Sequence, residues 1–341
     1  MYTKIKIIRN VYGDYLPNDF GLFLRLRDDK HNLNLNIFTG DFNEKYFFLE
    51  EENLGFYIEK DILIYNSAKE KQTYGVDLRT LKKKYSFDEI LYDLNLETRN
   101  IYGNYYYNVS EIDNNYLYNI TNGEINKIFE NKIVQGFISL INNDFVINKK
   151  DVNYLYCYST KDLTIIWQLN INTLFHTENE SEINQVKIYN DALIVVSNKG
   201  ICSIDIATGK VNWATKTYAL TIEIVGNIGY VCTNSSLYKI NLDTGIISGY
   251  GWEYNALPDI RFEEKDYTAF GYEVIYNEGL LWYRVYASGK SFIIAINPHD
   301  GYYEWIHYIK ESNKIDSVKF HKGRMYLRDI NGTLFVYEKN I

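Results

Sequence analysis

The stretch CSIDIATGKVNWATK, residues 202–216, decides the fold because its arrangement recurs along the chain. An alternating strand ends at an Ala-Thr-Gly corner, and a second strand that carries Trp213 follows at once. Gly209 suits such a corner because glycine adopts positive φ without a steric penalty, and Asp205 can cap the turn with its carboxylate. The stretch therefore predicts a β-hairpin with a tight corner.

Similar pairs of strands joined by a corner occur throughout the sequence. Neighbouring corners are about 40 residues apart and each interval holds several strands, which is the spacing typical of a β-propeller. We therefore predict an all-β fold in which residues 1–341 form a single β-propeller domain. The clearer copies are Tyr118–Phe129, Tyr156–Trp167, Lys239–Trp252 and Ala295–Trp305, and the weaker ones are Asn36–Phe48 and Val76–Phe87.

The two ends of the chain predict how the ring closes. Residues 316–340 contain three strand-like segments where a complete unit has four. The alternating segment Thr3–Asn10 is our candidate for the missing strand, because its pairing there would remove exposed sheet edges. This count gives eight four-stranded blades, with seven as the alternative if the N-terminal segment belongs wholly to the first unit.

The composition restricts the compartment and the class of partner. The 34 Tyr and 17 Phe favour strands, and the formal net charge of −8 disfavours nonspecific binding to nucleic acid or anionic membranes. No signal segment and no membrane-spanning run is apparent, and Cys157, Cys202 and Cys232 lie in strand-like sequence. We therefore expect a monomeric cytoplasmic protein with three reduced, structural thiols.

The residues Asp205, Thr208, Gly209 and Trp213 form the pattern Asp-x-x-Thr-Gly-x-x-x-Trp, which resembles the repeat of the quinoprotein-like (pyrroloquinoline-quinone-type) β-propellers. In that family the corner Gly and the Trp dock adjacent blades. The family's dehydrogenases also use adjacent cysteines, calcium and a catalytic Asp, and this chain has no Cys-Cys pair. The resemblance therefore implies a non-enzymatic member without a cofactor or metal. Further repeat positions are Trp167, Gly245, Trp252, Gly301 and Trp305.

No motif indicates catalysis. The five His residues are scattered over different units without metal-ligand spacing, and there is no nucleophile elbow, phosphate-binding loop or dinucleotide fingerprint. The alternative from another class is a carbohydrate-active or other hydrolytic propeller. Its carboxylates would have to converge over the central channel, and candidates such as Asp191 and Glu223 are far apart in sequence. A structural scaffold with several partners is a third interpretation.

Propeller topology sorts the loops onto two faces. The connections between blades share a face with those joining the second and third strands, and the Thr-Gly corners lie on the opposite face. The longest connections, Ile171–Ile183 and Asn255–Tyr272, are both acidic, and the second adds aromatic side chains, a combination found at interface hot spots. The predicted partner-binding residues are His176, Glu178, Glu180, Glu182, Asp259, Arg261, Phe262, Glu263, Glu264, Asp266, Tyr267, Phe270 and Tyr272.

These features predict a protein-binding propeller with an acidic working face. Its expected use is to neutralise a partner by occlusion, as bacterial immunity proteins do to toxins. A nuclease-type toxin domain is basic where it grips phosphate, so an acidic face could steer onto that site and cover it.

Overall fold

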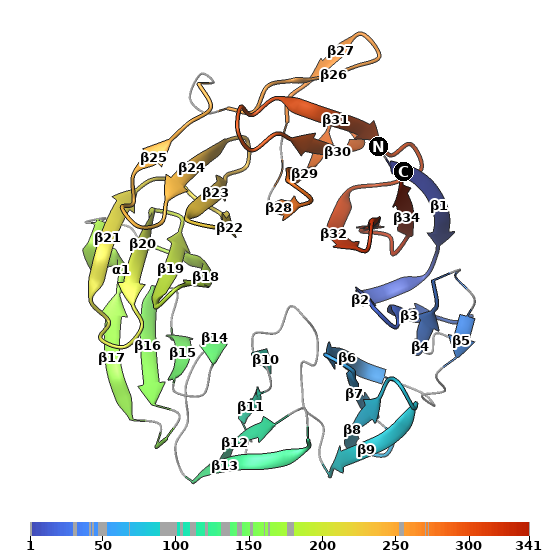
Figure 1. Cartoon of the computed structure of the whole chain (residues 1–341), viewed down its shortest axis with the longest axis vertical. Helices are drawn as coiled ribbons and strands as arrows, with labels where there is room; N and C mark the ends of the chain where they lie inside the picture. The colour runs from blue at the N-terminus through green and yellow to red at the C-terminus, as the bar shows by residue number, and fades with distance from the viewer. Residues whose placement is uncertain are drawn as a thin grey trace.

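The computed structural model describes most of the chain as strands arranged in a ring (Figure 1). Eight four-stranded antiparallel sheets and one separate two-stranded hairpin are present in it. The fold is therefore all-β, as predicted, and the described residues include a single helix of five residues. The described residues are 2–29, 33–40, 42, 44–46, 53–67, 69–88, 101–102, 105–109, 114–119, 122–130, 137–141, 145–150, 153–159, 161–162, 164–175, 181–251, 256–269, 271 and 273–340.

The strands follow one another sheet by sheet. The first four sheets contain β2 (Val11–Asn18), β3 (Gly21–Arg27), β4 (Leu33–Phe38) and β5 (Glu44–Tyr46); β6 (Asn53–Glu59), β7 (Ile62–Ser67), β8 (Gln72–Asp77) and β9 (Lys82–Phe87); β10 (Ile101–Tyr102), β11 (Tyr105–Val109), β12 (Asn114–Asn119) and β13 (Glu124–Glu130); and β14 (Phe137–Ile141), β15 (Phe145–Lys150), β16 (Tyr154–Ser159) and β17 (Ile165–Asn170).

The remaining sheets complete the ring. They contain β18 (Ile183–Tyr189), β19 (Ala192–Ser197), β20 (Gly200–Asp205) and β21 (Val211–Lys216); β22 (Thr221–Val225), β23 (Ile228–Cys232), β24 (Leu237–Asn241) and β25 (Ile247–Ser248); β28 (Val274–Asn277), β29 (Leu280–Ala287), β30 (Lys290–Ile296) and β31 (Tyr303–Tyr308); and β32 (Ile315–His321), β33 (Arg324–Asp329), β34 (Leu334–Lys339) and β1 (Tyr2–Ile8). The separate hairpin is β26 (Ile260–Phe262) with β27 (Lys265–Tyr267).

The hydrophobic core lies between neighbouring sheets rather than at the centre of the ring. In each sheet the first strand lies nearest the axis and the following strands lie progressively farther out (Figure 1). The middle strands β19 and β20 are buried almost throughout, because both of their faces are covered by adjacent sheets. This double coverage explains their nearly continuous apolar sequences.

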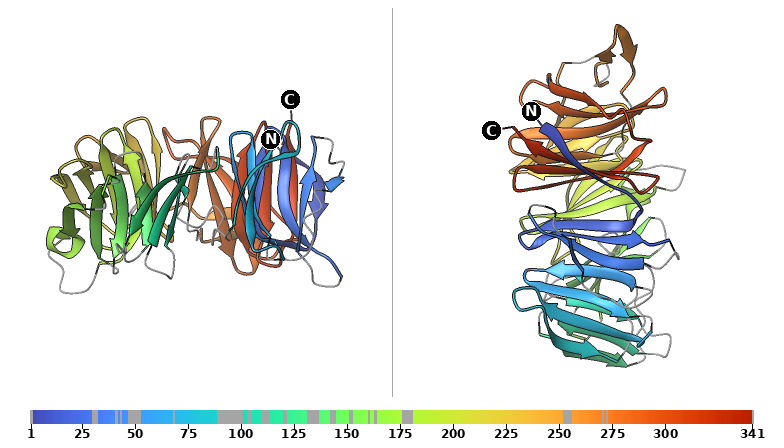
Figure 2. Two further views of the ribbon diagram at one scale, coloured as in Figure 1. Left: turned by 90° about the horizontal axis from the view of Figure 1, so that it is seen from below. Right: turned by 90° about the vertical axis from the view of Figure 1, so that its right-hand side faces the viewer.

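The ring closes as predicted, through the N-terminal strand. β1 pairs antiparallel with β34, from Tyr2 opposite Lys339 to Ile8 opposite Leu334, and becomes the outer strand of the last sheet. The two ends of the chain consequently lie together (Figure 2). Tyr15 of the next sheet then donates a hydrogen bond from its hydroxyl to the carbonyl of Tyr326 at 2.9 Å, which ties the first sheet to the closing one.

The Thr-Gly corners share one hydrogen-bond pattern. Asp205 Oδ1 accepts bonds from the Thr208 backbone N–H at 2.8 Å and from its hydroxyl at 2.6 Å, and Gly209 N–H donates to the Asp205 carbonyl. Gly209 has a φ of 71°, which only glycine adopts freely. The corner at residues 77–82 repeats these bonds around Asp77, but Leu81, with a φ of 56°, stands where the glycine would be.

At three corners the glycine packs against an aromatic ring from the preceding sheet. Trp167 of β17 lies flat against Gly209, and a Cβ atom on that glycine would come within 2.6 Å of the indole. The Trp167 indole N–H donates to the Ile206 carbonyl at 2.7 Å, within the same corner. The Gly and the Trp of one repeat therefore act in two different interfaces, one on each side of their sheet.

The same contact recurs around the ring. Trp213 packs on Gly245 of the following sheet and donates its indole N–H to the Leu242 carbonyl at 2.8 Å. Tyr85 takes the place of the Trp against Gly123. At these positions the corner glycine and the aromatic ring come from adjacent sheets and are in contact, whereas Trp252 lies outside the described residues. Trp305 is half-buried and packs against Tyr2 and Trp282.

One element of the fold was not expected. The connection after β17 begins with the short helix α1 (Ile171–Phe175), whose first and last side chains are buried against the neighbouring sheet. Asn170 accepts a hydrogen bond at Oδ1 from the Asn172 backbone N–H at 2.9 Å, which is the bond of a helix N-cap. Part of the predicted loop is thus a short helix that packs against the neighbouring sheet.

We expect Trp167→Ala to lower the free energy of unfolding by about 3–5 kcal/mol, because it leaves a cavity between two sheets and removes a hydrogen bond. Equilibrium urea unfolding followed by circular dichroism measures the change. Ile165→Ala on the same strand is the control, since Ile165 is exposed and its loss should change stability by no more than about 0.5 kcal/mol. Equal effects of the two variants would contradict the docking role of the indole.

We expect Leu81→Gly to raise the free energy of unfolding by about 0.5–1 kcal/mol, because a non-glycine residue at positive φ is strained and the Leu81 side chain is half exposed. Lys82→Gly, one residue later in β9, should lower it by a similar amount. Urea unfolding followed by circular dichroism tests this prediction. A lower free energy of unfolding for Leu81→Gly than for the unchanged protein would show that the corner is not strained.

Candidate functional site

Described residues of both long acidic connections contact turns on the face opposite the Thr-Gly corners. The first touches the β19–β20 turn, where Asn198 N–H donates to the Glu182 carbonyl at 3.1 Å. The second runs beside the β23–β24 turn, where Leu257 N–H donates to the Ser235 carbonyl at 2.9 Å. These turns join second and third strands, so they lie at the strand ends opposite the corners. We call this side of the ring the loop face.

The described parts of the first connection are helix α1 at its start and residues 181–183 at its end. His176, Glu178 and Glu180 lie outside the described residues. Glu182 is exposed, and its backbone N–H donates to Asn198 Oδ1 at 3.0 Å. The adjacent Ser181 is buried and donates its backbone N–H to Asn172 Oδ1 at 2.7 Å. The connection is therefore held at both ends by short-range polar contacts.

The second connection forms a hairpin that projects beyond the ring (Figures 1 and 2). β26 and β27 pair from Ile260 opposite Tyr267 to Phe262 opposite Lys265. Glu263 and Glu264 form the two-residue turn with φ angles of 51° and 62°, the geometry of a type I′ turn. Type I′ turns favour Asn-Gly, so a Glu-Glu pair is unusual in a turn with this backbone geometry.

The hairpin is anchored by its aromatic side chains. The Phe262 ring centroid lies 5.1 Å from that of Tyr308 and 5.6 Å from that of Phe292, and the Tyr267 centroid lies 5.4 Å from that of Phe292. Tyr267 and Ile260 are buried in the same hydrophobic cluster. These aromatic residues of the predicted interface therefore contact the protein's own sheet, with Phe262 only partly exposed.

A lysine lies against three of these rings. Lys290 Nζ lies 5.1 Å from the Phe262 ring centroid, 5.3 Å from that of Tyr267 and 5.0 Å from that of Tyr308. It also forms an ion pair with Glu263 at 3.2 Å. Hydrogen bonding to Tyr267 and then to Glu263 raises the pKa of Lys290, so the ammonium stays charged. We call Phe262, Tyr267 and Tyr308 the lysine cage.

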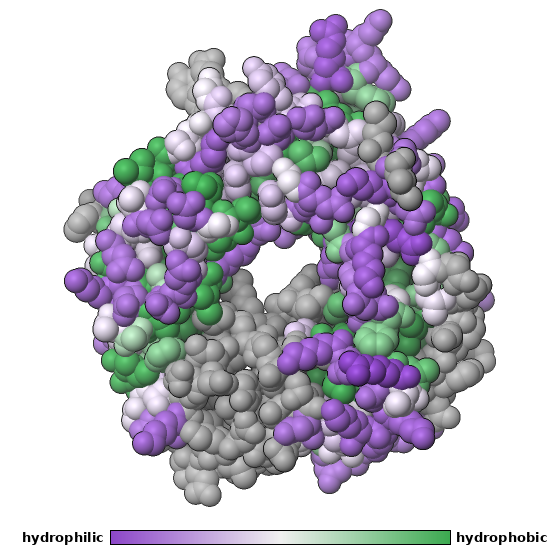
Figure 3. Space-filling view, in the orientation of Figure 1, coloured by the Kyte–Doolittle hydropathy of each residue, from purple (hydrophilic) through white to green (hydrophobic). Residues whose placement is uncertain are grey.

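The outward side of the hairpin is hydrophilic (Figure 3). Its exposed side chains are mostly charged, with four carboxylates against two cations. Phe270 and Tyr272, the remaining predicted residues, lie outside the described residues. The described residues of the second predicted group thus lie together in one projection with an acidic surface. The exposed charged residues are Asp259, Arg261, Glu263, Glu264, Lys265 and Asp266.

Of the two carboxylates considered for hydrolysis, Glu223 is held by neighbouring strands and Asp191 lies in a turn. Glu223 forms an ion pair with Lys187 at 2.7 Å and accepts the Tyr276 backbone N–H at 3.2 Å, linking three inner strands. Asp191 lies in the β18–β19 turn, at the end of the strands. Within the described ranges, no three His, Cys, Asp or Glu side chains come together to hold a metal ion.

The three cysteines have the environment of structural residues. All are free and buried, and burial raises the pKa of each thiol to about 12. Because a thiolate is the reactive form, these groups are poor nucleophiles at neutral pH. Among the described residues, no helix has the length and apolarity needed to cross a bilayer.

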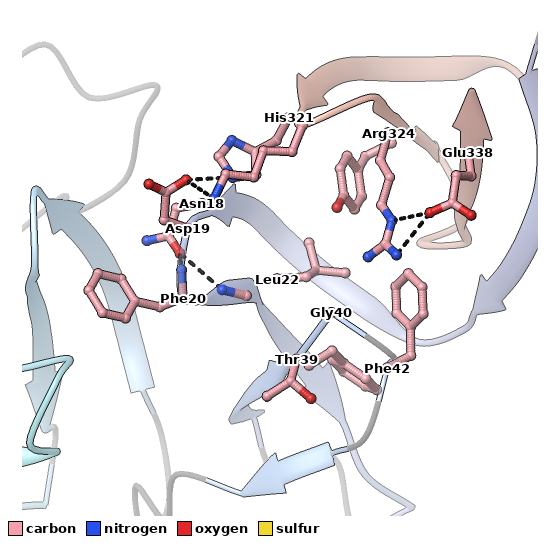
Figure 4. Close-up of a pocket in the computed structure, with 14 residues that line it drawn as sticks. Asn18, Asp19, Phe20, Leu22, Thr39, Gly40, Phe42, His321, Arg324 and Glu338 are labelled. Atoms are coloured by element: carbon pink, nitrogen blue, oxygen red, sulfur yellow. Dashed lines mark hydrogen bonds and ion pairs between the residues drawn. The ribbon is translucent and has the colours of Figure 1, made fainter. Parts of the chain in front are cut away.

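Sequence reasoning missed a cavity of about 360 Å³ on the corner face (Figure 4). It lies where the closing sheet meets the first sheet, and its lining includes Asp19, Phe42, His321 and Arg324. No local motif could have indicated it, because residues about three hundred positions apart form its walls. The corner face is therefore not the plain scaffold that its regular turns suggested.

Comparisons with known proteins support the fold alone. No protein family model matches the sequence, and no curated protein matches it. The chain is similar to the C-terminal WD40 domain of Sif2 (TM-score 0.64, 11% identity, covering 100% of this chain and 99% of that one). It is also similar to Sqt1 from Saccharomyces cerevisiae (0.61, 10%, 99% and 98%) and to BamB from Moraxella catarrhalis (0.60, 11%, 99% and 100%). The protein has a β-propeller fold.

We expect Lys290→Gln to loosen the hairpin, because the cage loses its cation and Glu263 its ion pair. A glutamate-specific protease should then cut at Glu263 or Glu264 several-fold faster under native conditions, as followed by mass spectrometry. Lys265→Gln on the hairpin itself is the control and should be cut at the rate of the unchanged protein. Equal cleavage of all three proteins would show that Lys290 does not hold the hairpin.

Proposed function

We propose that the protein binds another protein through its loop face, with the β26–β27 hairpin as the projecting contact. The observation that carries the proposal is a hairpin that is anchored internally yet presents exposed carboxylates at its tip. An element held in one conformation loses little entropy on association, so its charges can act without first being ordered.

The charge of this surface favours a basic partner. The whole chain carries a formal charge of −8, and Asp259, Glu263, Glu264 and Asp266 outnumber Arg261 and Lys265 on the hairpin. Complementary charge mainly accelerates association and rejects wrong partners, rather than supplying most of the affinity. The projecting carboxylates therefore suit a partner with a cationic patch, such as one that binds phosphate.

The finer proposal is neutralisation by occlusion in the manner of a bacterial immunity protein, with a basic toxin domain as partner. In this proposal the chain is a cytoplasmic, non-enzymatic propeller whose repeat resembles that of the pyrroloquinoline-quinone-type proteins. Support comes from the acidic projection, and from carboxylates and thiols whose contacts among the described residues are structural. A hydrolytic function and a multi-partner scaffold have no comparable observation in their favour.

We expect the double variant Glu264→Lys and Asp266→Lys to slow association with a basic partner, sought among the products of neighbouring genes, by about tenfold at low salt. Surface plasmon resonance at two salt concentrations measures the association rate. High salt should reduce the difference in rate between the double variant and the unchanged protein, because salt screens exposed charges. Growth of cells producing that partner reports neutralisation.

The control carries the same change in charge elsewhere. Asp243→Lys with Glu304→Lys alters two exposed carboxylates away from the hairpin and should leave association nearly unchanged. Equal slowing by both double variants would assign the effect to total charge and contradict the hairpin as the contact. Failure of the unchanged protein to bind any basic product of the neighbouring genes would contradict the immunity role.

A further inference from the structure

The cavity at the closure of the ring has the size of a small-molecule site. Its volume of about 360 Å³ lies within the range of known ligand pockets. The β2–β3, β4–β5 and β32–β33 turns surround it, so three separate segments meet there (Figure 4). A second hollow of about 590 Å³ shares Asn18, Asp19, Phe20 and His321 with it, which makes these residues a common wall.

Two ion pairs stand on opposite sides of the cavity (Figure 4). On one side Asp19 Oδ1 lies 2.9 Å from Lys322 Nζ and 3.1 Å from His321 Nε2. On the other side Arg324 contacts Glu338 Oε1 from Nη2 at 2.9 Å and from Nε at 3.0 Å. Each side therefore presents both a cation and a carboxylate.

Two side chains on the common wall, Asn18 and His321, each have a nitrogen without a hydrogen-bond partner among the described residues. Asn18 Oδ1 accepts the backbone N–H groups of Phe20 and Gly21, which fixes the amide, while its buried Nδ2 has no hydrogen-bond acceptor among the described residues. His321 Nε2 is close to Asp19 but is not aligned for a hydrogen bond. Hydrogen bonding and charge from Lys322 lower the pKa of Asp19, so this carboxylate is ionised at neutral pH.

The space between the ion pairs has apolar walls. Leu22 and Phe38 line it and are buried, and Phe42 lines it opposite the Asp19 side (Figure 4). The Arg324 guanidinium carbon lies 5.0 Å from the Phe42 ring centroid, so a cation–π contact fixes the ring beside the charges. The cavity thus combines charges of both signs with a hydrophobic surface between them.

We propose that this cavity binds a zwitterion, namely a free α-amino acid with an apolar side chain. A simple anion would have to compete with Asp19 and Glu338 for the cations, and a simple cation would compete with Lys322 and Arg324. A zwitterion compensates for this competition, because its carboxylate can pair with the cations while its ammonium group pairs with the carboxylates. The side chain then covers Leu22 and Phe42. The site lies on the corner face and does not depend on the protein-binding proposal.

Isothermal titration calorimetry with three compounds of similar shape tests the proposal. L-Phenylalanine carries both charges, 3-phenylpropanoate only the negative one, and phenethylamine only the positive one. We expect saturable binding of phenylalanine with a dissociation constant of about 1 mM or below, and binding at least about tenfold weaker for the other two. Absence of binding by phenylalanine, or equal binding by a singly charged compound, would overturn the proposal.

Two substitutions locate the binding. Lys322→Gln and Glu338→Gln remove one charge from each side, and because both side chains are at least half exposed, little change in folding is expected. Each should weaken phenylalanine binding about fivefold or more, while Lys216→Gln at an exposed outer-strand position should not alter it. Unchanged binding in both cavity variants, with folding verified by circular dichroism, would place the ligand elsewhere and reject the site.

Discussion

The packing of an aromatic ring on the glycine corner of the next sheet is the contact on which the rest of the ring depends. Trp167 on Gly209 and Trp213 on Gly245 leave no room for a side chain at the corner, and each indole also donates a hydrogen bond to that corner. Tyr85 makes the same kind of contact with Gly123, so this packing joins three pairs of neighbouring sheets. The ring then closes through the pairing of β1 with β34.

A closed ring of this kind separates loops that can vary from turns that cannot. The corner residues form hydrogen bonds and pack against rings, so they tolerate little change. The connections on the loop face join one sheet to the next and do not form these corner hydrogen bonds. The β26–β27 hairpin lies in one of these connections, yet its aromatic side chains return to the sheet and lie against Lys290. Internal packing therefore holds the projection, and its outward carboxylates remain available for a partner.

Much of the fold was predictable because its signals are local. Asp205, Thr208 and Gly209 form their corner within five residues, and the alternation of Thr3–Asn10 marks a strand that lacks a partner nearby. The candidate site was predictable only as a charged loop. Phe262 and Tyr267 have the composition of an interface, but their contacts with Phe292 and Tyr308 depend on residues far along the chain.

The sequence by itself determined the repeating unit and which N-terminal segment was available to close the ring, because corner residues and side-chain alternation are signals within short segments. Only the tertiary structure decided which charged and aromatic residues meet. The lysine cage and its lysine join a loop to two later strands, and the cavity joins Asp19 to His321 and Phe42 to Arg324. Such contacts carry no local signal, since they arise only when the closing sheet and the first sheet are brought together.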